Sequence, residues 1–280
     1  MICEKCSAVW VTRGPAPALA KCPFCGENLP AVNKKAAEPS DKVILNLKDL
    51  TKVYDGGIRA VDKVNFDINQ GEFVVLYGPS GCGKSTLLKM ISGFEEITVG
   101  EVRVDGEFLN FIPPEKRPVA MVSQNYGSTA HDHKSVNSRE RLNNGALSMD
   151  TSVYENMAYD LRNLKVPKAE IDDRINKAAR MMDIEKFLER NGKALSYGQR
   201  WRVAFGRAFI RMPKIILLDD PLNEIDGQNH ASTFRAMLME DLSNMQREHN
   251  LTILYATCDQ SDITTAYADR VIKMKDGIIQ

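Results

Sequence analysis

The sequence predicts an α/β fold with a largely parallel sheet and a separate antiparallel β layer. Short apolar runs at 73–77, 119–122, 215–218 and 251–256 are typical of buried strands. Helix-like segments separate several of these runs, and strands joined by helices usually pair in parallel. Residues 43–47, 61–68 and 101–104 alternate apolar and polar side chains instead, as half-exposed antiparallel strands do.

The first buried run leads into the most informative stretch, Gly78-Pro79-Ser80-Gly81-Cys82-Gly83-Lys84-Ser85-Thr86, which fits the phosphate-binding pattern G-x-x-x-x-G-K-[ST]. The glycines let backbone N–H groups surround phosphate oxygens, and the helix expected from residue 87 adds positive potential. Lys84 can neutralise the outer phosphates, and the Ser85 hydroxyl can ligate magnesium. The alternative is a glycine-rich turn without a ligand, but every fixed position matches in the required strand-to-helix context.

A pair of carboxylates supports the same interpretation. The apolar run 215–218 ends in Asp219 and Asp220. In proteins with this loop, a carboxylate at a strand end completes the magnesium site. Asp219 is therefore the expected magnesium ligand. Asp220 points elsewhere, as neighbours on a strand do, and is a candidate for polarising an attacking water. The alternative is a strand end with two solvated aspartates.

Three further elements follow from local patterns. Apolar residues at helical spacing predict a helix over 171–188. Asp105-Gly106 predicts a turn after the strand at 101–104. Residues 271–274 and 277–279 predict a closing hairpin around Lys275-Asp276.

The composition argues against a nucleic-acid-binding, a membrane-spanning or a secreted protein. The 280 residues allow one large domain with a small appendage, and 37 basic residues balance 37 acidic ones, so nucleic acid is not an expected partner. No apolar run approaches the roughly 18 residues that span a bilayer, and the N-terminus lacks the apolar core of a signal peptide. The expected location is therefore the cytoplasm, with any membrane role depending on a separate partner.

The first residues form a different kind of region. Two C-x-x-C pairs, Cys3 with Cys6 and Cys22 with Cys25, have the spacing of a zinc ribbon. Four thiolates would complete a tetrahedral, structural Zn²⁺ site. The alternatives are free cysteines or two disulfides. We therefore expect a zinc-ribbon-like segment at 1–27, a linker at 28–41 rich in Ala, Pro, Lys and Asn, and the main domain at 42–280.

Beyond these features, residues 43–280 resemble the ATP-binding subunits of ABC transporters, especially those that drive carbohydrate importers. The likeness is carried by the glycine loop, by Asp219, and by the stretches at 152–159, 166–171 and 274–277. It implies a P-loop NTPase fold with a RecA-like core, an antiparallel β subdomain and a helical subdomain inserted at about 125–210.

The resemblance also implies roles for individual residues. Tyr54 would stack on adenine, residues 78–86 would hold the phosphates, and Gln124 would reach magnesium and sense the membrane partner. Leu195-Ser196-Tyr197-Gly198-Gln199 matches the signature loop, which acts on ATP held by the opposite subunit. Two copies would then sandwich two nucleotides, with Ser196, Gly198 and Gln199 contacting ATP across the interface. Asp226 matches the loop after the Asp219 strand.

Three departures from the family pattern lie where the γ-phosphate would sit. Asp220 stands in place of the catalytic glutamate, Cys258 in place of a histidine, and Tyr197 in place of the first signature glycine. A carboxylate one methylene shorter and a weakly donating thiol predict ATP binding with slow hydrolysis. A fourth departure is the long segment 127–151, with His131 and His133, for which a partner contact and a tolerated insertion both stay open.

These observations predict an ATPase subunit of an ABC-type importer, with sugars as the expected cargo and ATP and Mg²⁺ as its ligands. Its expected partners are membrane-spanning transporter subunits and a second ATPase subunit, identical or different, at the inner face of the membrane. The alternative is a catalytically weakened switch that dimerises on ATP and regulates a partner without transport. Soluble ABC proteins of DNA repair or translation need coiled-coil insertions or tandem domains, which this sequence lacks.

Overall fold

The computed structural model describes residues 41–123, 147–222, 231–263 and 267–280, with the backbone alone for 231–234. The chain divides into two compact units, Met1–Ala36 and Ala37–Gln280. All the described residues belong to the second unit.

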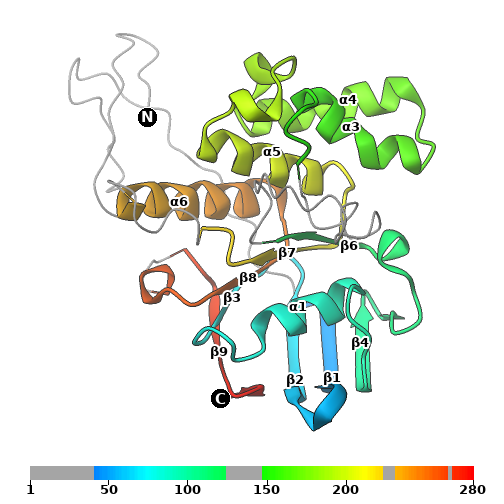
Figure 1. The fold of residues 1–280 in the computed structure, drawn as a ribbon, viewed down its shortest axis with the longest axis vertical. Helices are drawn as coiled ribbons and strands as arrows, with labels where there is room; N and C mark the ends of the chain where they lie inside the picture. Colours follow the sequence, from blue (N-terminus) through cyan, green and yellow to red (C-terminus); the bar gives the residue numbers. More distant parts are fainter. Residues whose placement is uncertain (1–40, 124–146, 223–230, 264–266) are drawn as a thin grey trace. The chain divides into compact units, whose positions relative to one another are not determined.

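A six-stranded sheet in the order β10-β9-β3-β8-β7-β6 forms the centre of this unit (Figure 1). Neighbouring strands from β9 to β6 pair in parallel, and β10 closes the edge as an antiparallel hairpin strand. The predicted, largely parallel sheet is therefore confirmed. Its strands are β3 (Phe73–Tyr77), β6 (Val119–Val122), β7 (Ile215–Asp219), β8 (Ile253–Thr257), β9 (Arg270–Lys275) and β10 (Ile278–Ile279).

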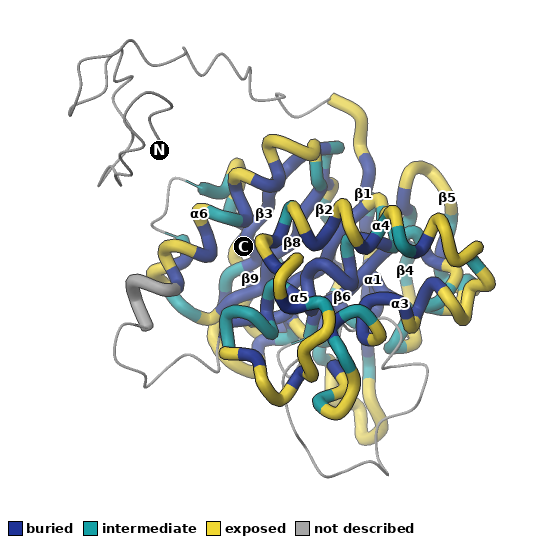
Figure 2. The backbone as a smooth tube through the Cα atoms, turned by 90° about the horizontal axis from the view of Figure 1, so that it is seen from above, coloured by how far each residue is buried: buried dark blue, intermediate teal, exposed yellow. Residues whose placement is uncertain are grey.

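The two faces of this sheet bury two separate apolar clusters. Side chains alternate along a strand, so Phe73 and Val75 pack with the helices on one face, while Val74 and Leu76 pack on the other. All four side chains are fully buried, and the central strands are dark blue in Figure 2. Burial on both faces explains why these strands read as continuous apolar runs.

A second, antiparallel sheet in the order β2-β1-β4-β5 confirms the separate β layer. Asp105 and Gly106 form the predicted turn between β4 and β5, with φ of +53° and +80°. Helix α1 (Lys84–Ser92) joins the two sheets, because its apolar side chains share one cluster with both (Figure 1). The strands are β1 (Val43–Val53), β2 (Arg59–Asn69), β4 (Val99–Val104) and β5 (Glu107–Phe108).

Four further helices lie on the side of the core sheet opposite α1 and share one apolar cluster with its strands (Figure 1). None of the helices in the described part of the chain is both long and apolar enough to cross a membrane. The helices are α3 (Val153–Asn163), α4 (Lys168–Met181), α5 (Tyr197–Phe209) and α6 (Ala231–His249), and short 3-10 turns lie at Asp55–Gly57, Pro114–Lys116, Glu185–Phe187, Gly192–Ala194 and Gln260–Asp262.

The structure has a helix where one was predicted over 171–188, but this helix ends before the apolar pattern does. Helix α4 begins at Lys168 and ends at Met181, and Asp183 then adopts a φ of +52° that a continuing helix cannot accommodate. Ile184 and Phe187 still reach the same core, through the 3-10 turn that follows. The spacing of buried side chains therefore continued past the end of the helix itself.

Candidate functional site

The glycine loop at 78–86 connects the central strand β3 to α1 and presses against two other strands. A Cβ on Gly78 would lie 2.2 Å from the carbonyl oxygen of Met274 on β9. Gly83, which precedes the first residue of α1, has a φ of +105°, and a Cβ there would lie 2.2 Å from the carbonyl oxygen of Ala60. The loop can follow this path only because both positions are glycine.

Lys84 lies buried beneath the loop. Its side chain is buried, and its ammonium donates to the carbonyl oxygens of Gly78 at 2.7 Å and Pro79 at 3.0 Å. The tip of the loop at Pro79, Ser80 and Gly81 is exposed. The structure therefore places a buried cation beneath a loop whose outer surface is open to an anion.

Ser85 and Asp219 meet across the sheet edge, as the motif predicts. The Ser85 hydroxyl donates to Asp219 Oδ1 at 2.8 Å, joining the start of α1 to the end of β7. Burial raises the pKa of Asp219, and the Ser85 hydrogen bond and the charges of Lys89 and Lys84 oppose that rise. A hydroxyl beside a buried carboxylate is a donor set of hard oxygens, which fits Mg²⁺.

Asp220 and Cys258 also meet, although they are far apart in sequence. The Cys258 thiol donates to Asp220 Oδ2 at 3.4 Å. Burial raises the pKa of Asp220, while the thiol hydrogen bond and the charge of Lys84 lower it. Burial and the neighbouring carboxylate raise the pKa of Cys258, so the thiol stays neutral. The sequence singled out both residues but did not predict their contact, which depends on the pairing of β7 with β8.

A buried polar network behind Cys258 was missed by sequence reasoning. The Asp262 carboxylate accepts hydrogen bonds from the hydroxyls of Tyr255 at 2.9 Å and Thr257 at 2.7 Å and from Arg235 at 3.0 Å. These contacts fix the end of β8, one residue before Cys258. Tyr255 and Thr257 are two residues apart on a buried strand, so their hydroxyls face the same side of the sheet. This spacing is the signal that could have suggested the network.

Tyr54, predicted to stack on adenine, follows the last residue of β1 and is 37% exposed. Its hydroxyl donates to Glu95 at 3.0 Å, and Lys52 Nζ lies 5.0 Å from the ring centroid. The ring is thus held in place by its polar end and by a cation, while a large part of it remains open to solvent.

The signature stretch forms the start of α5. Ser196 is the N-cap: its hydroxyl accepts from the Gln199 amide at 3.3 Å, and Gln199 Oε1 accepts from the Ser196 N–H at 2.9 Å. Ser196, Gly198 and Gln199 line a hollow of about 290 Å³ whose lining includes no residue of the glycine loop. Within one chain, these three signature residues therefore line a hollow that the phosphate loop does not share.

Several predicted residues lie outside the described residues: Gln124, Asp226, His131, His133, Cys3, Cys6, Cys22 and Cys25. Among the residues that are described, no group of three or more His, Cys, Asp or Glu side chains could hold a metal ion.

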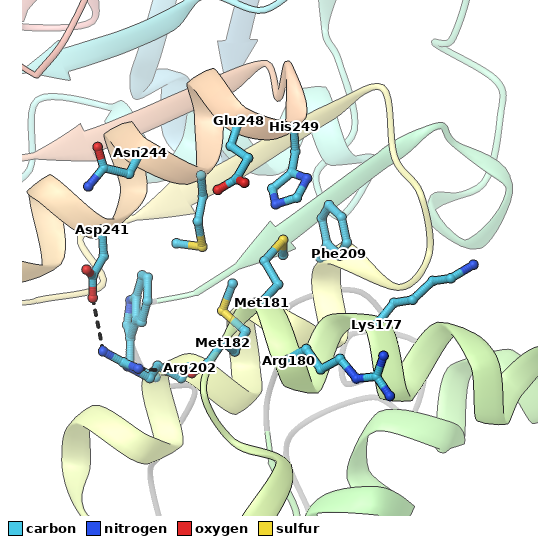
Figure 3. A pocket seen from close by; sticks show the side chains of 12 residues that line it. Lys177, Arg180, Met181, Met182, Arg202, Phe209, Asp241, Asn244, Glu248 and His249 are labelled. Carbon is cyan, nitrogen blue, oxygen red and sulfur yellow. Dashed lines mark hydrogen bonds and ion pairs between the residues drawn. The ribbon is translucent and has the colours of Figure 1, made fainter. Parts of the chain in front are cut away.

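A larger cavity of about 740 Å³ lies away from the loop, between α4, α5 and α6 (Figure 3). Met181, Met182 and Phe209 contribute apolar surface, and Arg202 donates to Asp241 at 3.1 Å across one side of it. None of the predicted nucleotide residues lines this cavity. The candidate site is instead the edge of the sheet at which Ser85 and Asp219 meet.

Known proteins are similar to this chain in both sequence and fold. The sn-glycerol-3-phosphate import ATP-binding protein UgpC of Rhodopseudomonas palustris (strain BisB18) is 42% identical over 84% of this chain. The putative uncharacterized ABC transporter ATP-binding protein YcjV of Escherichia coli (strain K12) is 39% identical over the same share. The matched parts span 58% and 59% of those two proteins, so the chain covers less than two thirds of their length.

Two solved structures extend the likeness to the fold. CbiO1 of Clostridium perfringens, described as part of the ABC transporter complex cbiONQ, matches with a TM-score of 0.70 and 28% identity, over 86% of this chain and 88% of that one. The dimeric ATP-binding cassette MJ0796, bound to ADP and Pi, matches with a TM-score of 0.65 and 27% identity, over 85% and 97%. The family model for ABC transporters matches residues 61–223, from β2 past Asp219. With the loop, the strand-end carboxylates and the two-sheet fold in place, the chain belongs to the ABC transporter family.

Proposed function

We propose that this chain binds Mg-ATP and hydrolyses it slowly, as the ATPase subunit of an ABC-type importer. The observation that carries the proposal is the junction of β3, α1 and β7. There, Lys84 lies buried under the open glycine loop, and Ser85 is hydrogen-bonded to Asp219. The parallel strands all end at this edge of the sheet, which is where α/β proteins bind their ligands.

Each residue at this edge has a role that fits its surroundings. The loop amides and Lys84 would hold the β- and γ-phosphates, and Ser85 and Asp219, with Gln124, would hold Mg²⁺. When bound, the metal ion neutralises charge on the phosphate oxygens. Asp220 would orient a water and accept its proton as the oxygen attacks the γ-phosphorus and the bond to ADP breaks, releasing ADP and phosphate.

Slow hydrolysis follows from the residues around Asp220. Its carboxylate is one methylene shorter than a glutamate, and a misplacement of about 1 Å can cost roughly a hundredfold in rate. Its Oδ2 also accepts a hydrogen bond from the Cys258 thiol, so one carboxylate oxygen already has a partner. A neutral thiol is a weak donor, so it is a poor substitute for an imidazole at the γ-phosphate.

We also propose a transport partner and cargo. Relatives named for import of sn-glycerol-3-phosphate suggest a polar, polyol- or sugar-like cargo. Two membrane-spanning subunits and a second ATPase subunit would complete the transporter at the inner face of the membrane. The half-exposed ring of Tyr159, within the importer-like stretch on α3, would face the membrane subunit.

A second candidate function is an ATP-dependent dimerisation switch without transport. The Asp220–Cys258 contact favours it, because a site that holds ATP without cleaving it quickly keeps a dimer closed. The rate of hydrolysis in the presence of the membrane subunits discriminates the two. A transporter ATPase should be stimulated by them, whereas a switch should not.

The N-terminal cysteines form a separate proposal, supported by their spacing alone. We propose that Cys3, Cys6, Cys22 and Cys25 hold one structural Zn²⁺. The purified full chain should then contain one zinc per molecule, and Cys22→Ser should lose it. Equal zinc content in the two proteins would reject the site.

Nucleotide binding is tested by titrating the full chain with ATP and Mg²⁺ in a calorimeter. Lys84→Ala should weaken binding at least tenfold, which corresponds to about 1.4 kcal/mol. Lys48→Ala, an exposed lysine on β1, is the matched control and should bind like the wild type. Equal affinity of the Lys84→Ala variant and the wild type would contradict the proposed site.

A further inference from the structure

The side chain of Tyr197 connects the signature stretch to the loop that carries Asp220. Tyr197 is the first residue of α5, and its hydroxyl donates to the carbonyl oxygen of Pro221 at 2.9 Å. Pro221 follows Asp220 directly and is buried. A glycine at position 197, as the family pattern has, carries no group that could make this contact.

The peptide after Asp220 needs such support. Asp220 has a φ of +44°, a region that non-glycine residues rarely adopt. Its own N–H donates to the Ala256 carbonyl at 2.9 Å, which fixes the residue on the β8 side. Pro221 has no N–H, so its carbonyl is its only backbone group for hydrogen bonding, and the bond to it comes from Tyr197.

The other end of the contact is held firmly as well. The reciprocal hydrogen bonds of Ser196 and Gln199, one residue before and two residues after Tyr197, cap the start of α5. The Tyr197 ring is half-buried and packs on the large apolar cluster beneath the helix. The hydroxyl therefore donates from the fixed start of a helix to a loop with a strained backbone. A contact from a rigid element can hold such a loop in position.

We propose that Tyr197 is a positioning residue for Asp220. Its bond to Pro221 sets where the Asp220 carboxylate lies and ties that position to α5, whose first turn carries Ser196 and Gly198. This inference rests on the proposed function, in which Asp220 orients the attacking water. It gives a role to the hydroxyl of a tyrosine that stands where the family pattern has a glycine.

Tyr197→Phe removes the hydroxyl and keeps the packed ring. We expect kcat to fall about tenfold, while KM and the affinity for Mg-ATP stay within about twofold, because the contact acts on Asp220 and not on ATP binding. Tyr267→Phe alters another half-buried tyrosine on the same cluster and should leave kcat unchanged. Unchanged kcat in Tyr197→Phe, or a rise in KM without a fall in kcat, would overturn the proposal.

A double-mutant cycle with Asp220→Asn separates positioning from a structural effect. If Tyr197 acts through Asp220, adding Tyr197→Phe to Asp220→Asn should cause little further loss in single-turnover hydrolysis. Full additivity of the two losses would contradict the proposal.

Hydrogen–deuterium exchange of the nucleotide-free protein tests the contact without any activity. Tyr197→Phe should speed exchange in a peptide covering residues 219–222 and leave the rest of β7 unchanged. Unchanged exchange there would overturn the inference even in a chain that hydrolyses ATP. Failure of the proposed function would appear differently, as a wild-type chain that does not bind Mg-ATP.

Discussion

Asp220 and Cys258 face each other at the ends of two neighbouring strands, and their hydrogen bond joins two of the residues that depart from the family pattern. The two changes are therefore not independent. The Asp220 carboxylate accepts this bond from the Cys258 thiol, which is a weak donor. The ionisation of Asp220 should accordingly depend on Cys258.

The pH dependence of hydrolysis tests this coupling. Burial raises the pKa of Asp220, and the Cys258 hydrogen bond opposes that rise. Cys258→Ala removes the opposing contact, so the pKa of Asp220 should rise further. Because a base must be deprotonated to accept a proton, the acid limb of the kcat–pH profile should move to higher pH.

Cys258→Ser is the control for this shift, because its hydroxyl keeps a donor beside Asp220. Its acid limb should lie at or below that of the wild type. Identical pH profiles for the alanine variant and the wild type would show that Asp220 does not titrate under the influence of Cys258.

Residues of the local motif were predictable, whereas contacts between distant segments were not. Lys84 and Ser85 follow from the glycine-loop motif and Asp219 from the apolar run that precedes it, and the structure brings Ser85 and Asp219 into contact. The bonds of Cys258 to Asp220 and of Tyr197 to Pro221 depend on which strands pair and where α5 begins. Neither fact is encoded in local spacing.

At the scale of elements, the buried strands were the most readable part of the sequence, because burial on both faces leaves an unbroken apolar run. The ends of elements were harder to predict. The apolar spacing that suggested a helix to residue 188 belongs partly to α4 and partly to a 3-10 turn after Asp183. The two-residue strand β5 escaped prediction because it is too short to show alternation.

A buried ion pair joins two of the helices that flank the site. Arg207 on α5 donates to both oxygens of Asp160 on α3, at 2.8 and 2.9 Å, and both side chains are about 95% buried. Asp160→Ala leaves the guanidinium without that partner and should lower the free energy of unfolding by about 3–5 kcal/mol. Urea denaturation measures the change.

An exposed pair on the same helix is the matched control. Glu155 pairs with Arg162 at the surface, so Glu155→Ala should cost less than about 1 kcal/mol. Similar losses for Asp160→Ala and Glu155→Ala would show that the Asp160–Arg207 pair does not lock α3 to α5.

At the scale of the whole molecule, the residues expected to contact ATP lie in two places. The phosphate loop, Asp219 and Asp220 gather at the carboxyl ends of the parallel strands. The signature residues line a different hollow at the start of α5. We therefore expect the phosphate loop of one chain to bind the nucleotide and the signature residues of a second subunit to complete the site.

We propose that this site binds Mg-ATP and that Asp220 and Cys258 make its hydrolysis slow. The steady-state rate of ATP hydrolysis, compared between the wild type and the Asp220→Glu/Cys258→His variant at saturating Mg-ATP, tests it most directly. We predict slow turnover in the wild type and a rate at least tenfold higher in the variant, since a well-placed general base contributes roughly 10²–10⁴-fold. A wild-type rate equal to that of the variant would contradict the account.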